Sequence, residues 1–341
     1  MTSVGIIGSS GYLGGELLRL LLGHPHVRIA AAVSSRMPGK RIDTVHPNLR
    51  GHGNLVFCAE EDLAEVDVLL LAAPHRETMR LLPRLAARAK VIIDLSGDFR
   101  LADPAIYERY YGVAHEAPDQ LTGFVPGCPE LYRDQLRDAG RISVPGCMAT
   151  AAILAIKPLA ESGLIEPDVD IDARTGSSGS GASAGPSNLH AERSGAMRVF
   201  ATSGHRHEAE IAAHCAVTAR MTATGVEAVR GVQVLCRAKL AREVTERDLY
   251  TLYRTRYAGE PFVRLVAQRR GLYRLPEPKI LLGSNFCDVG FALDQRGGRV
   301  LAIAALDNLM KGGAGAAVQS LNVRMGWPER LGLEFAGLHP L

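Results

Sequence analysis

The stretch that decides the fold class is Val4-Gly5-Ile6-Ile7-Gly8-Ser9-Ser10-Gly11-Tyr12-Leu13-Gly14. An apolar run is followed by glycines at every third position and then by leucines that share one face of a helix. A strand, a glycine turn and a helix in this order form the context of a dinucleotide-binding site. In such a site Gly8 permits the tight turn, Gly11 lets the backbone approach a pyrophosphate, and Gly14 lets helix and strand pack closely. The spacing is G-x-x-G-x-x-G rather than G-x-G-x-x-G, and the alternative is a turn that binds no ligand.

Short apolar runs continue along the first half of the chain, at Val27–Val33, Val66–Ala73, Val91–Leu95 and Ile142–Val144. They alternate with helical patterns and lack the period-two alternation of a half-exposed strand. Buried strands of this kind are typical of a parallel sheet that is covered by helices on both faces. The sequence therefore predicts an α/β fold with a Rossmann domain over residues 1–147, and ligands are expected at the carboxyl ends of its strands.

The second half of the chain has a different pattern after about residue 165. Apolar and polar residues alternate there, as in a sheet with one solvated face, at Val169–Ala173, Val232–Leu240, Phe262–Val266 and Phe291–Leu293. We expect a second, α+β domain over residues 148–305 that binds substrate and forms oligomers. A helix near Leu306–Met325 is expected to return to the first domain, which residues 306–341 complete.

The segment Thr175–Pro186 consists almost wholly of Gly, Ser and Ala. It has no apolar face to bury, so a flexible linker is one interpretation. The segment follows a predicted strand inside the second domain, and a functional loop is the other interpretation.

Length and charge exclude several classes of protein. A chain of 341 residues exceeds what one core usually serves, so two domains are expected. The formal net charge is only +3 and there is no basic run, so nucleic acid is not the expected partner, whereas a small anionic substrate is compatible. No stretch approaches the ~18 apolar residues of a membrane span, and no secretory signal follows Met1, so we expect a cytoplasmic protein.

The end of the second predicted strand indicates the cofactor. Val33-Ser34-Ser35-Arg36 carries no Asp or Glu, the residue with which NAD enzymes usually hold the ribose 2′-hydroxyl. Hydroxyl groups and a guanidinium suit a 2′-phosphate instead. NADP(H) is therefore favoured over NAD(H), and the alternative for Arg36 is a solvated surface position.

The cysteines point to a single reactive thiol. Six cysteines are scattered without a C-x-x-C pair, so neither a disulfide framework nor a zinc site is expected. Cys147 follows a predicted buried strand, and a predicted helix begins at it. A thiolate at a helix N-terminus is stabilised by the helix dipole and by unpaired N–H groups, so Cys147 is the candidate nucleophile. Cys128 is its nearest rival, and a buried structural cysteine is the alternative role.

A nucleophile needs a base, and the segment Gly204-His205-Arg206-His207-Glu208-Ala209-Glu210 offers two imidazoles. One of them can move protons, while Arg206 binds an anion and Glu210 orients its neighbours. The sequence leaves open whether His205 or His207 is the acid/base. No second cluster with metal-ligand spacing accompanies the segment, so no metal is expected. A polar loop at a helix cap is the alternative.

These motifs also carry a family resemblance, which covers essentially the whole chain. Five of them occur in the order found in N-acetyl-γ-glutamyl-phosphate reductases of arginine biosynthesis: Gly8–Gly14, Asp94-Leu95-Ser96-Gly97-Asp98-Phe99-Arg100, Pro145-Gly146-Cys147-Met148-Ala149-Thr150, Gly204-His205-Arg206-His207 and Asp307-Asn308-Leu309-Met310-Lys311-Gly312. Two further stretches resemble the lysine-biosynthesis branch of that family, His190-Ala191-Glu192-Arg193 and the tail Asn322-Val323-Arg324-Met325-Gly326-Trp327-Pro328. That branch reduces a glutamyl or aminoadipyl phosphate borne on a small acidic amino-group carrier protein.

The resemblance implies a mechanism and a second domain like that of glyceraldehyde-3-phosphate dehydrogenase. Cys147 would attack the acyl phosphate and form a thioester, which NADPH would reduce to the semialdehyde, with His207 as acid/base. A homotetramer or homodimer is implied. A non-catalytic NADP-binding sensor is a remote alternative, because it would keep the glycine turn but need no activated thiol.

The expected site residues follow from the motifs and the resemblance together. Substrate contacts are expected from Ser96, Arg100, Ser178, His205, Arg206 and Glu210. Cofactor contacts are expected from Gly8, Ser9, Ser10, Gly11, Tyr12, Leu13, Gly14, Ser34, Ser35, Arg36, Pro74, Ser178 and Asn308.

The glycine loop departs from the family pattern. Acetylglutamyl enzymes tend to carry an arginine after this loop, where Ala182 stands here. The loss favours a carrier-bound acyl group, with Arg193 and Arg198 facing an acidic carrier, over free N-acetylglutamyl phosphate, which is the alternative substrate. Glutamyl and aminoadipyl chains differ by one methylene, which the sequence does not resolve.

Overall fold

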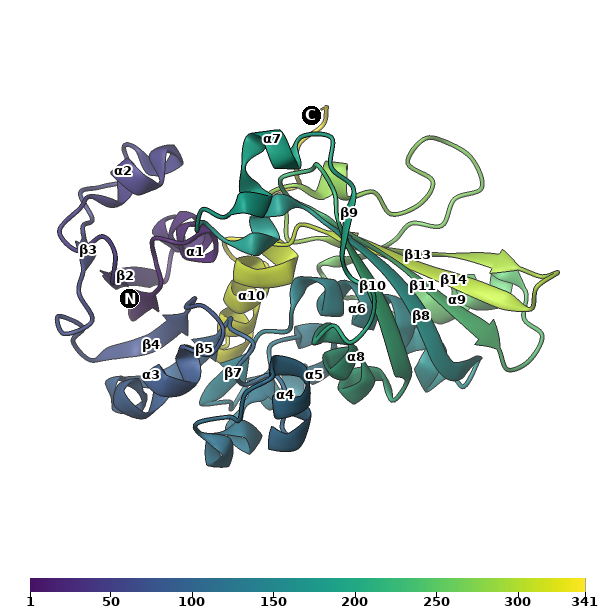
Figure 1. Cartoon of the computed structure of the whole chain (residues 1–341), viewed down its shortest axis with the longest axis horizontal. Coiled ribbons are helices and arrows are strands. Elements are labelled where there is room, and N and C mark those ends of the chain that lie inside the picture. Colours follow the sequence, from purple (N-terminus) through teal and green to yellow (C-terminus); the bar gives the residue numbers. More distant parts are fainter. Residues whose placement is uncertain (341) are drawn as a thin grey trace. The chain divides into compact units, whose positions relative to one another are not determined.

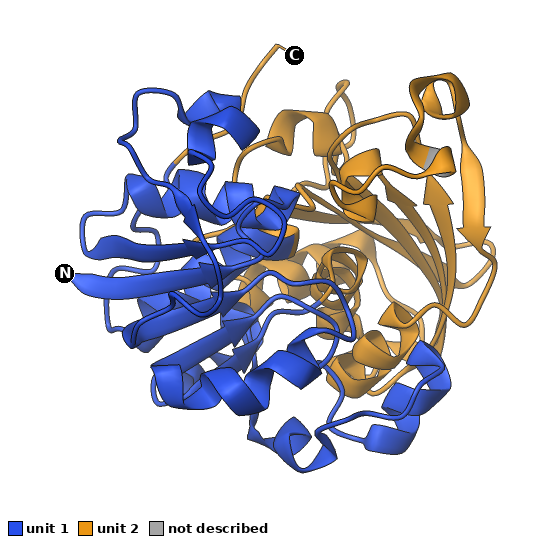
Figure 2. Ribbon diagram, turned by 60° about the vertical axis from the view of Figure 1, so that its left-hand side comes forward, with its two compact units in different colours: residues 1–145, 313–334 blue, residues 146–312, 335–341 orange. Residues whose placement is uncertain are grey.

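The protein folds as two compact units (Figure 2). The computed structural model describes residues 1–340, without the side chain of Ser187. Unit 1 comprises residues 1–145 and 313–334, and unit 2 comprises residues 146–312 with the chain from Phe335 onward. Cys147 thus lies in the first helix of unit 2.

Unit 1 is built on a parallel sheet of seven strands in the order β3-β2-β1-β4-β5-β7-β6. This arrangement confirms the predicted Rossmann sheet, since each predicted apolar run forms one of its strands. The strands are β1 (Thr2–Ile7), β2 (Val27–Val33), β3 (Phe57–Cys58), β4 (Val66–Leu71), β5 (Ala89–Asp94), β6 (Val125–Pro126) and β7 (Arg141–Ser143).

The helices of unit 1 follow from the strand order. The chain moves outward from β1 to β2 and later moves outward in the opposite direction from β4 to β5. Because both crossovers are right-handed, α1 and α3 lie on opposite faces of the sheet (Figure 1). The helix α10 packs against α1 and α5. The helices are α1 (Tyr12–Leu22), α2 (Ile42–Val45), α3 (Thr78–Leu85), α4 (Pro104–Tyr111), α5 (Pro129–Leu136) and α10 (Gly315–Arg324).

Unit 2 contains a mixed sheet of seven strands in the order β12-β13-β14-β11-β8-β10-β9. The pairs β8–β10 and β12–β13 are parallel, and the others are antiparallel. Four of these strands correspond to predicted runs, whereas no run was predicted at β9, β10 or β14. The strands are β8 (Ile165–Thr175), β9 (Arg198–Ala201), β10 (Thr218–Gly225), β11 (Val232–Leu240), β12 (Val263–Leu265), β13 (Cys287–Asp294) and β14 (Arg299–Leu306).

Helices cover one face of this second sheet. The helix α6 packs against β8, β11 and β14, α8 packs against β10, and α9 packs against β13 (Figure 1). The opposite face carries cross-strand ion pairs such as Arg220–Asp168, as expected for a half-solvated sheet. Within residues 1–340, no helix has the length and apolar character to cross a membrane. The helices of unit 2 are α6 (Cys147–Glu161), α7 (His190–Arg193), α8 (His207–Cys215) and α9 (Glu246–Arg256).

The predicted helix over Leu306–Met325 was wrong in its first part. Leu306 is the last residue of β14 and pairs with strands on both sides. The buried carboxylate of Asp307 then accepts hydrogen bonds from Leu309 N and Met310 N and turns the chain. A π-helical turn, Met310–Ala314, precedes α10.

A proline inside α6 is compensated by Tyr257, the C-cap residue of α9. Pro158 has no N–H, so the carbonyl of Leu154, one turn earlier, lacks its helical donor. Tyr257 donates its hydroxyl to Leu154 O at 2.5 Å, and Tyr253 donates to Ala155 O at 2.6 Å. These hydroxyl groups join α9 to the helix that carries Cys147.

We predict that Tyr257→Phe lowers the free energy of unfolding by about 1–2 kcal/mol, because a buried carbonyl loses its donor. Urea unfolding of the whole chain measures this change. Tyr250→Phe is the matched control, since Tyr250 lies on the same helix with an exposed ring. Equal stability of the Tyr257→Phe variant and the wild type would contradict the compensation.

Candidate active site

Three predicted cofactor segments lie at one edge of the sheet in unit 1. The strands β2, β1 and β4 are neighbours and parallel, so their carboxyl ends meet. The turn Gly8–Gly14 follows β1, Ser34–Arg36 follows β2, and Pro74 lies in the loop after β4. The structure thus brings these segments together at the place where open parallel sheets bind ligands.

The glycines of the turn have distinct roles. Gly8 has φ +75°, and a Cβ there would lie 2.5 Å from Ala72 O. A Cβ at Gly14 would lie 2.5 Å from the Cα of Ser9. At Gly11 the nearest atom would be Gly8 O at 3.4 Å, so packing alone does not demand a glycine there. The role of Gly11 in the close approach of a ligand stays a prediction, and packing does not offer another reason for the glycine.

The start of α1 suits a phosphate group. Gly11 is its N-cap, and no side chain caps the helix. The first N–H groups of a helix lack intrahelical partners and favour anions. Tyr12 is exposed at this end and Leu13 is half-buried.

The serines near this turn divide into structural and accessible groups. Ser9 is buried and donates its hydroxyl to Val33 O at 2.7 Å, which joins the turn to β2. The hydroxyls of Ser10 and Ser34 lie 2.7 Å apart. Ser35 and Arg36 are exposed beside them.

Ser96 and Arg100 are bonded to the main chain and to a buried acid within unit 1. Ser96 donates its hydroxyl to the carboxylate of Asp94 at 2.9 Å, and burial raises the pKa of Asp94 to about 7. The guanidinium of Arg100 donates to Val144 O at 2.8 Å and to Leu95 O at 3.0 Å. These bonds fix the loop after β5, and the substrate role of both residues stays a prediction.

Cys147 is placed as the sequence predicts, at the first residue of α6. The thiol is half-buried at the positive end of the helix dipole. Among the other cysteines, burial raises the pKa of Cys58 and Cys236, and raises that of Cys215 to about 12. The predicted rival, Cys128, is buried with its Sγ 3.5 Å from a carboxylate oxygen of Glu130, and a neighbouring negative charge disfavours a thiolate.

The imidazole of His207 lies against the residue that precedes Cys147. A Cβ at Gly146 would overlap the His207 ring. His205 accepts a hydrogen bond at Nδ1 from His207 N at 3.2 Å, and the two rings meet edge to face. This geometry favours His207 as the acid/base and His205 as the group that orders the start of α8.

Gly312 packs directly on the candidate nucleophile. A Cβ at this position would lie 2.5 Å from the Cβ of Cys147 and 3.0 Å from its Cα. The main chain of the π-helical turn therefore touches Cys147 only because residue 312 has no side chain.

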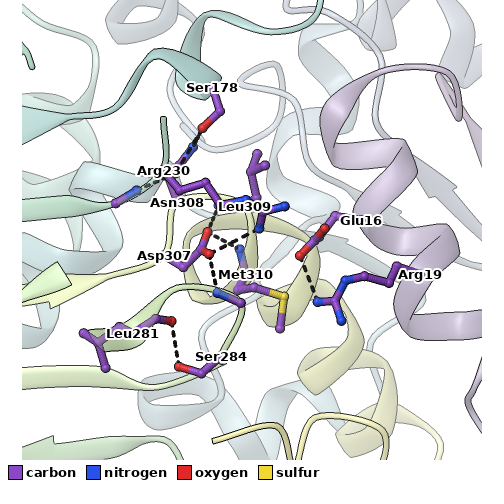
Figure 3. A network of polar contacts seen from close by, with 12 residues as sticks. Glu16, Arg19, Ser178, Arg230, Leu281, Ser284, Asp307, Asn308, Leu309 and Met310 are labelled. Atoms are coloured by element: carbon purple, nitrogen blue, oxygen red, sulfur yellow. Dashed lines mark hydrogen bonds and ion pairs between the residues drawn. The ribbon is translucent and has the colours of Figure 1, made fainter. Parts of the chain in front are cut away.

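A polar network in unit 2 orients the amide of Asn308 (Figure 3). Asn308 accepts at Oδ1 from Gly231 N at 3.0 Å, and its Nδ2 donates to the Ser178 hydroxyl at 3.0 Å. The neighbouring Asp307 is fully buried, accepts from Gly283 N, and pairs with Arg230 at 3.2 Å. The network holds the amide in one orientation, with Nδ2 as the donor side.

The glycine loop is anchored at its beginning. Gly176 N donates to Gly231 O, Ser177 N donates to Ala228 O, and Ser178 N donates to Val229 O. A short 3₁₀ helix, Ser177–Ser180, follows. These contacts favour a functional loop over a flexible linker for residues 176–178.

The arginines expected to face a carrier have partners inside unit 2. Arg193 donates to Val226 O, next to the end of β10. Arg198 donates to Glu192 O at 3.1 Å. Arg206 lies at the N-cap of α8.

Sequence reasoning missed several residues that hold these groups. Arg230 and Asp307 form an ion pair across 77 positions, and Gly312 meets Cys147 from a remote part of the chain. No local pattern marks such pairings. The motif Asp307-Asn308 led to a prediction for Asn308 alone, and its acid was the one local signal for the ion pair with Arg230.

Comparisons with known proteins agree with this architecture. Residues 3–139 match the model described as semialdehyde dehydrogenase, NAD binding domain, and residues 147–308 match semialdehyde dehydrogenase, dimerisation domain. The chain belongs to the semialdehyde dehydrogenase family. The chain is therefore an enzyme with an NAD(P)-binding domain. The predicted fold class and the predicted family resemblance are both confirmed.

Individual family members resemble the chain along its whole length. The LysW-L-2-aminoadipate 6-phosphate reductase of Deinococcus radiodurans is 46% identical, over 99% of this chain and 98% of its own. A Thermomicrobium roseum protein named provisionally for the same reaction is 49% identical over 100% of both chains. The crystal structure of aspartate semialdehyde dehydrogenase II from Vibrio cholerae superposes with a TM-score of 0.73 at 17% identity, covering 96% of this chain and 98% of its own. This last likeness shows a common fold.

We predict that Gly312→Ala displaces Cys147 and costs about 1–3 kcal/mol of unfolding free energy, as overpacking does. Alkylation of Cys147 by iodoacetamide, followed by mass spectrometry, should slow in this variant. Gly185→Ala is the control, because no atom lies within 4 Å of a Cβ at that position. Normal alkylation in the Gly312→Ala variant would show that the contact does not position the thiol.

We predict that Gly11→Ala weakens NADPH binding by about 10-fold or more, because the methyl group blocks hydrogen bonds from the main chain to a charged phosphate. Stability should change little, since the new Cβ meets only Gly8 O at 3.4 Å. Fluorescence titration with NADPH and thermal unfolding measure the two effects. Gly14→Ala, which overlaps the turn, should instead lose stability.

Proposed function

We propose that this protein is an NADPH-dependent acyl-phosphate reductase that converts a carrier-bound aminoadipyl or glutamyl phosphate to its semialdehyde. The observation that carries the proposal is the placement of His207 against Gly146, directly before the helix-start thiol of Cys147. The names of the relatives at 46% and 49% identity support the same reaction.

The first step is acyl transfer to Cys147. Its thiolate attacks the carbonyl carbon, the carbon–oxygen bond to phosphate breaks, and inorganic phosphate leaves with the electron pair, so that a thioester remains on the enzyme. His207 takes the thiol proton before the attack. The start of α6 stabilises the thiolate through its dipole.

The second step reduces the thioester. When bound, NADPH supplies a hydride to the thioester carbonyl. His207 protonates the resulting oxyanion and then accepts that proton as the thiohemiacetal collapses, so that the aldehyde leaves and the Cys147 thiolate is restored. Two moderate barriers thus replace one large barrier.

The start of α1, the end of β2 and the Asn308 network each offer groups that fit part of a dinucleotide phosphate cofactor. The uncapped start of α1 and the open position at Gly11 suit the pyrophosphate. Ser34, Ser35 and Arg36 offer hydroxyl and guanidinium groups, without an acid, to a 2′-phosphate. The oriented Nδ2 of Asn308 would donate to the nicotinamide carboxamide, with Ser178 beside it.

The carrier-bound substrate is favoured over a free one. Ala182 stands where an arginine would help to bind a small free substrate, and a tether would hold the phosphate end with fewer local contacts. Free N-acetylglutamyl phosphate is the second candidate, supported by the resemblance to arginine-pathway enzymes. A homodimer or homotetramer is proposed from the match to a dimerisation domain.

The reverse reaction tests the substrate. NADP⁺ reduction in the presence of phosphate should proceed with a semialdehyde attached to the carrier protein and should be at least ~10-fold less efficient with N-acetylglutamate semialdehyde. NAD⁺ serves as the cofactor control. Equal efficiency with the free acetylated compound would reject the carrier as the substrate.

Cys147→Ala tests the covalent route. We expect turnover to fall by about 10⁴-fold or more while NADPH binding is retained. Cys128→Ala is the control and should keep its activity. Appreciable turnover by Cys147→Ala would exclude the thioester, and rapid alkylation of Cys147 near neutral pH would argue against a non-catalytic sensor.

A further inference from the structure

The carboxylate of Glu210 lies between the groups on which the proposed reaction depends. Glu210 belongs to α8, and only 1% of it is exposed. Its Oε2 accepts a hydrogen bond from Gly146 N at 2.8 Å, and its Oε1 lies 3.8 Å from His207 Nε2. One side chain therefore contacts both the main chain that leads into Cys147 and the candidate acid/base.

The bond to Gly146 fixes the approach to the nucleophile. Gly146 is the N-cap of α6 and has an extended conformation, with φ −64° and ψ 151°. The helix has no side-chain cap of its own. The Gly146 carbonyl accepts the helical hydrogen bond from Thr150 N at 2.7 Å, and its N–H is held by the remote carboxylate, so the residue before Cys147 is tied to α8 as well as to its own helix.

The second oxygen of Glu210 faces the imidazole. The His207 ring is packed against Gly146, so it has little freedom to turn away. A proton on Nε2 would be directed toward the Glu210 carboxylate, and a negative charge at this distance stabilises an imidazolium. A neutral carboxamide in the same place would keep the shape and lose that stabilisation.

We propose that Glu210 is a positioning residue, which holds the Gly146 main chain and stabilises protonated His207, rather than a ligand of the substrate. The inference rests on the proposed function, since it concerns how the thiol and the imidazole are prepared. It specifies the orienting role that the sequence predicts for Glu210 and is proposed in place of the substrate contact that was also expected.

Other ionisable groups surround the pair. His205 packs on His207 from the segment before α8. His214 follows on α8, and burial lowers its pKa. The charge of Lys157 also lowers the pKa of His214, whereas the charge of Glu210 raises it. Lys157, on α6, donates to His214 O. Glu208 instead accepts from Gly204 N and Met221 N, so its carboxylate has a separate structural use.

The test is the pH dependence of Cys147 alkylation in Glu210→Gln. The midpoint of the iodoacetamide rate, followed on the Cys147 peptide, should rise by about one pH unit, because the imidazolium partner of the thiolate is weakened. With the carrier-bound substrate, kcat should fall by about 10- to 100-fold with little change in KM. Glu208→Gln is the matched control and should lower the melting temperature without moving the midpoint.

Two results would overturn the inference. An unchanged alkylation midpoint with a raised KM would indicate that Glu210 is a substrate ligand. No change in the midpoint, kcat or KM would show that Glu210 neither positions the site nor binds substrate. If Glu210→Gln fails to fold, Glu210→Asp replaces it, for which we expect an intermediate shift. Alkylation needs no substrate, so it tests the role of Glu210 even if the proposed reaction is wrong. A wrong reaction would be recognised separately, because the wild-type enzyme would turn over neither substrate.

Discussion

The packing of α6 on the sheet of unit 2 is the interaction on which the candidate site depends. The helix is buried along nearly its whole length and contacts β8, β11 and β14. Small residues such as Ala149, Ala152 and Ala155 are fully buried and let the helix approach its neighbours closely. A nucleophile at the first residue of such a helix is held by the core of the unit, not by a loop.

The groups around Cys147 reach it because side chains are absent at two positions. Gly146 leaves room for the imidazole of His207, and Gly312 leaves room for the main chain of the π-helical turn. Neither glycine has a positive φ, so the backbone conformation does not require glycine at either position. The requirement is the space that a Cβ would occupy. The site thus depends on close packing of α6, α8 and the turn, which brings its polar groups within bonding distance.

The parts that the sequence predicts are those that local patterns determine. The strands of the parallel sheet, the glycine turn and the helix start at Cys147 each depend on neighbouring residues, and the structure confirms them, although several strands of the two sheets begin or end up to four residues from the predicted positions. The strand β10 was missed because its buried residues, Ala219, Met221 and Ala223, include two that are too small to mark a strand. The bonds Gly146–Glu210 and Ser178–Asn308 join residues 64 and 130 positions apart, which no local pattern can indicate.

The motif after β5 has a structural use that does not depend on its predicted contact with substrate. Asp98 is buried and accepts from Arg76 N at 2.7 Å and Met79 N at 3.0 Å, which joins the loop after β5 to the loop after β4. Ser96 and Arg100 are likewise bonded to groups of unit 1. A buried polar group must find a partner as the chain folds, and these residues meet that requirement within unit 1, partly with groups of neighbouring loops. Such a motif is expected wherever two sheet-edge loops must be held in register, whichever ligand they then bind.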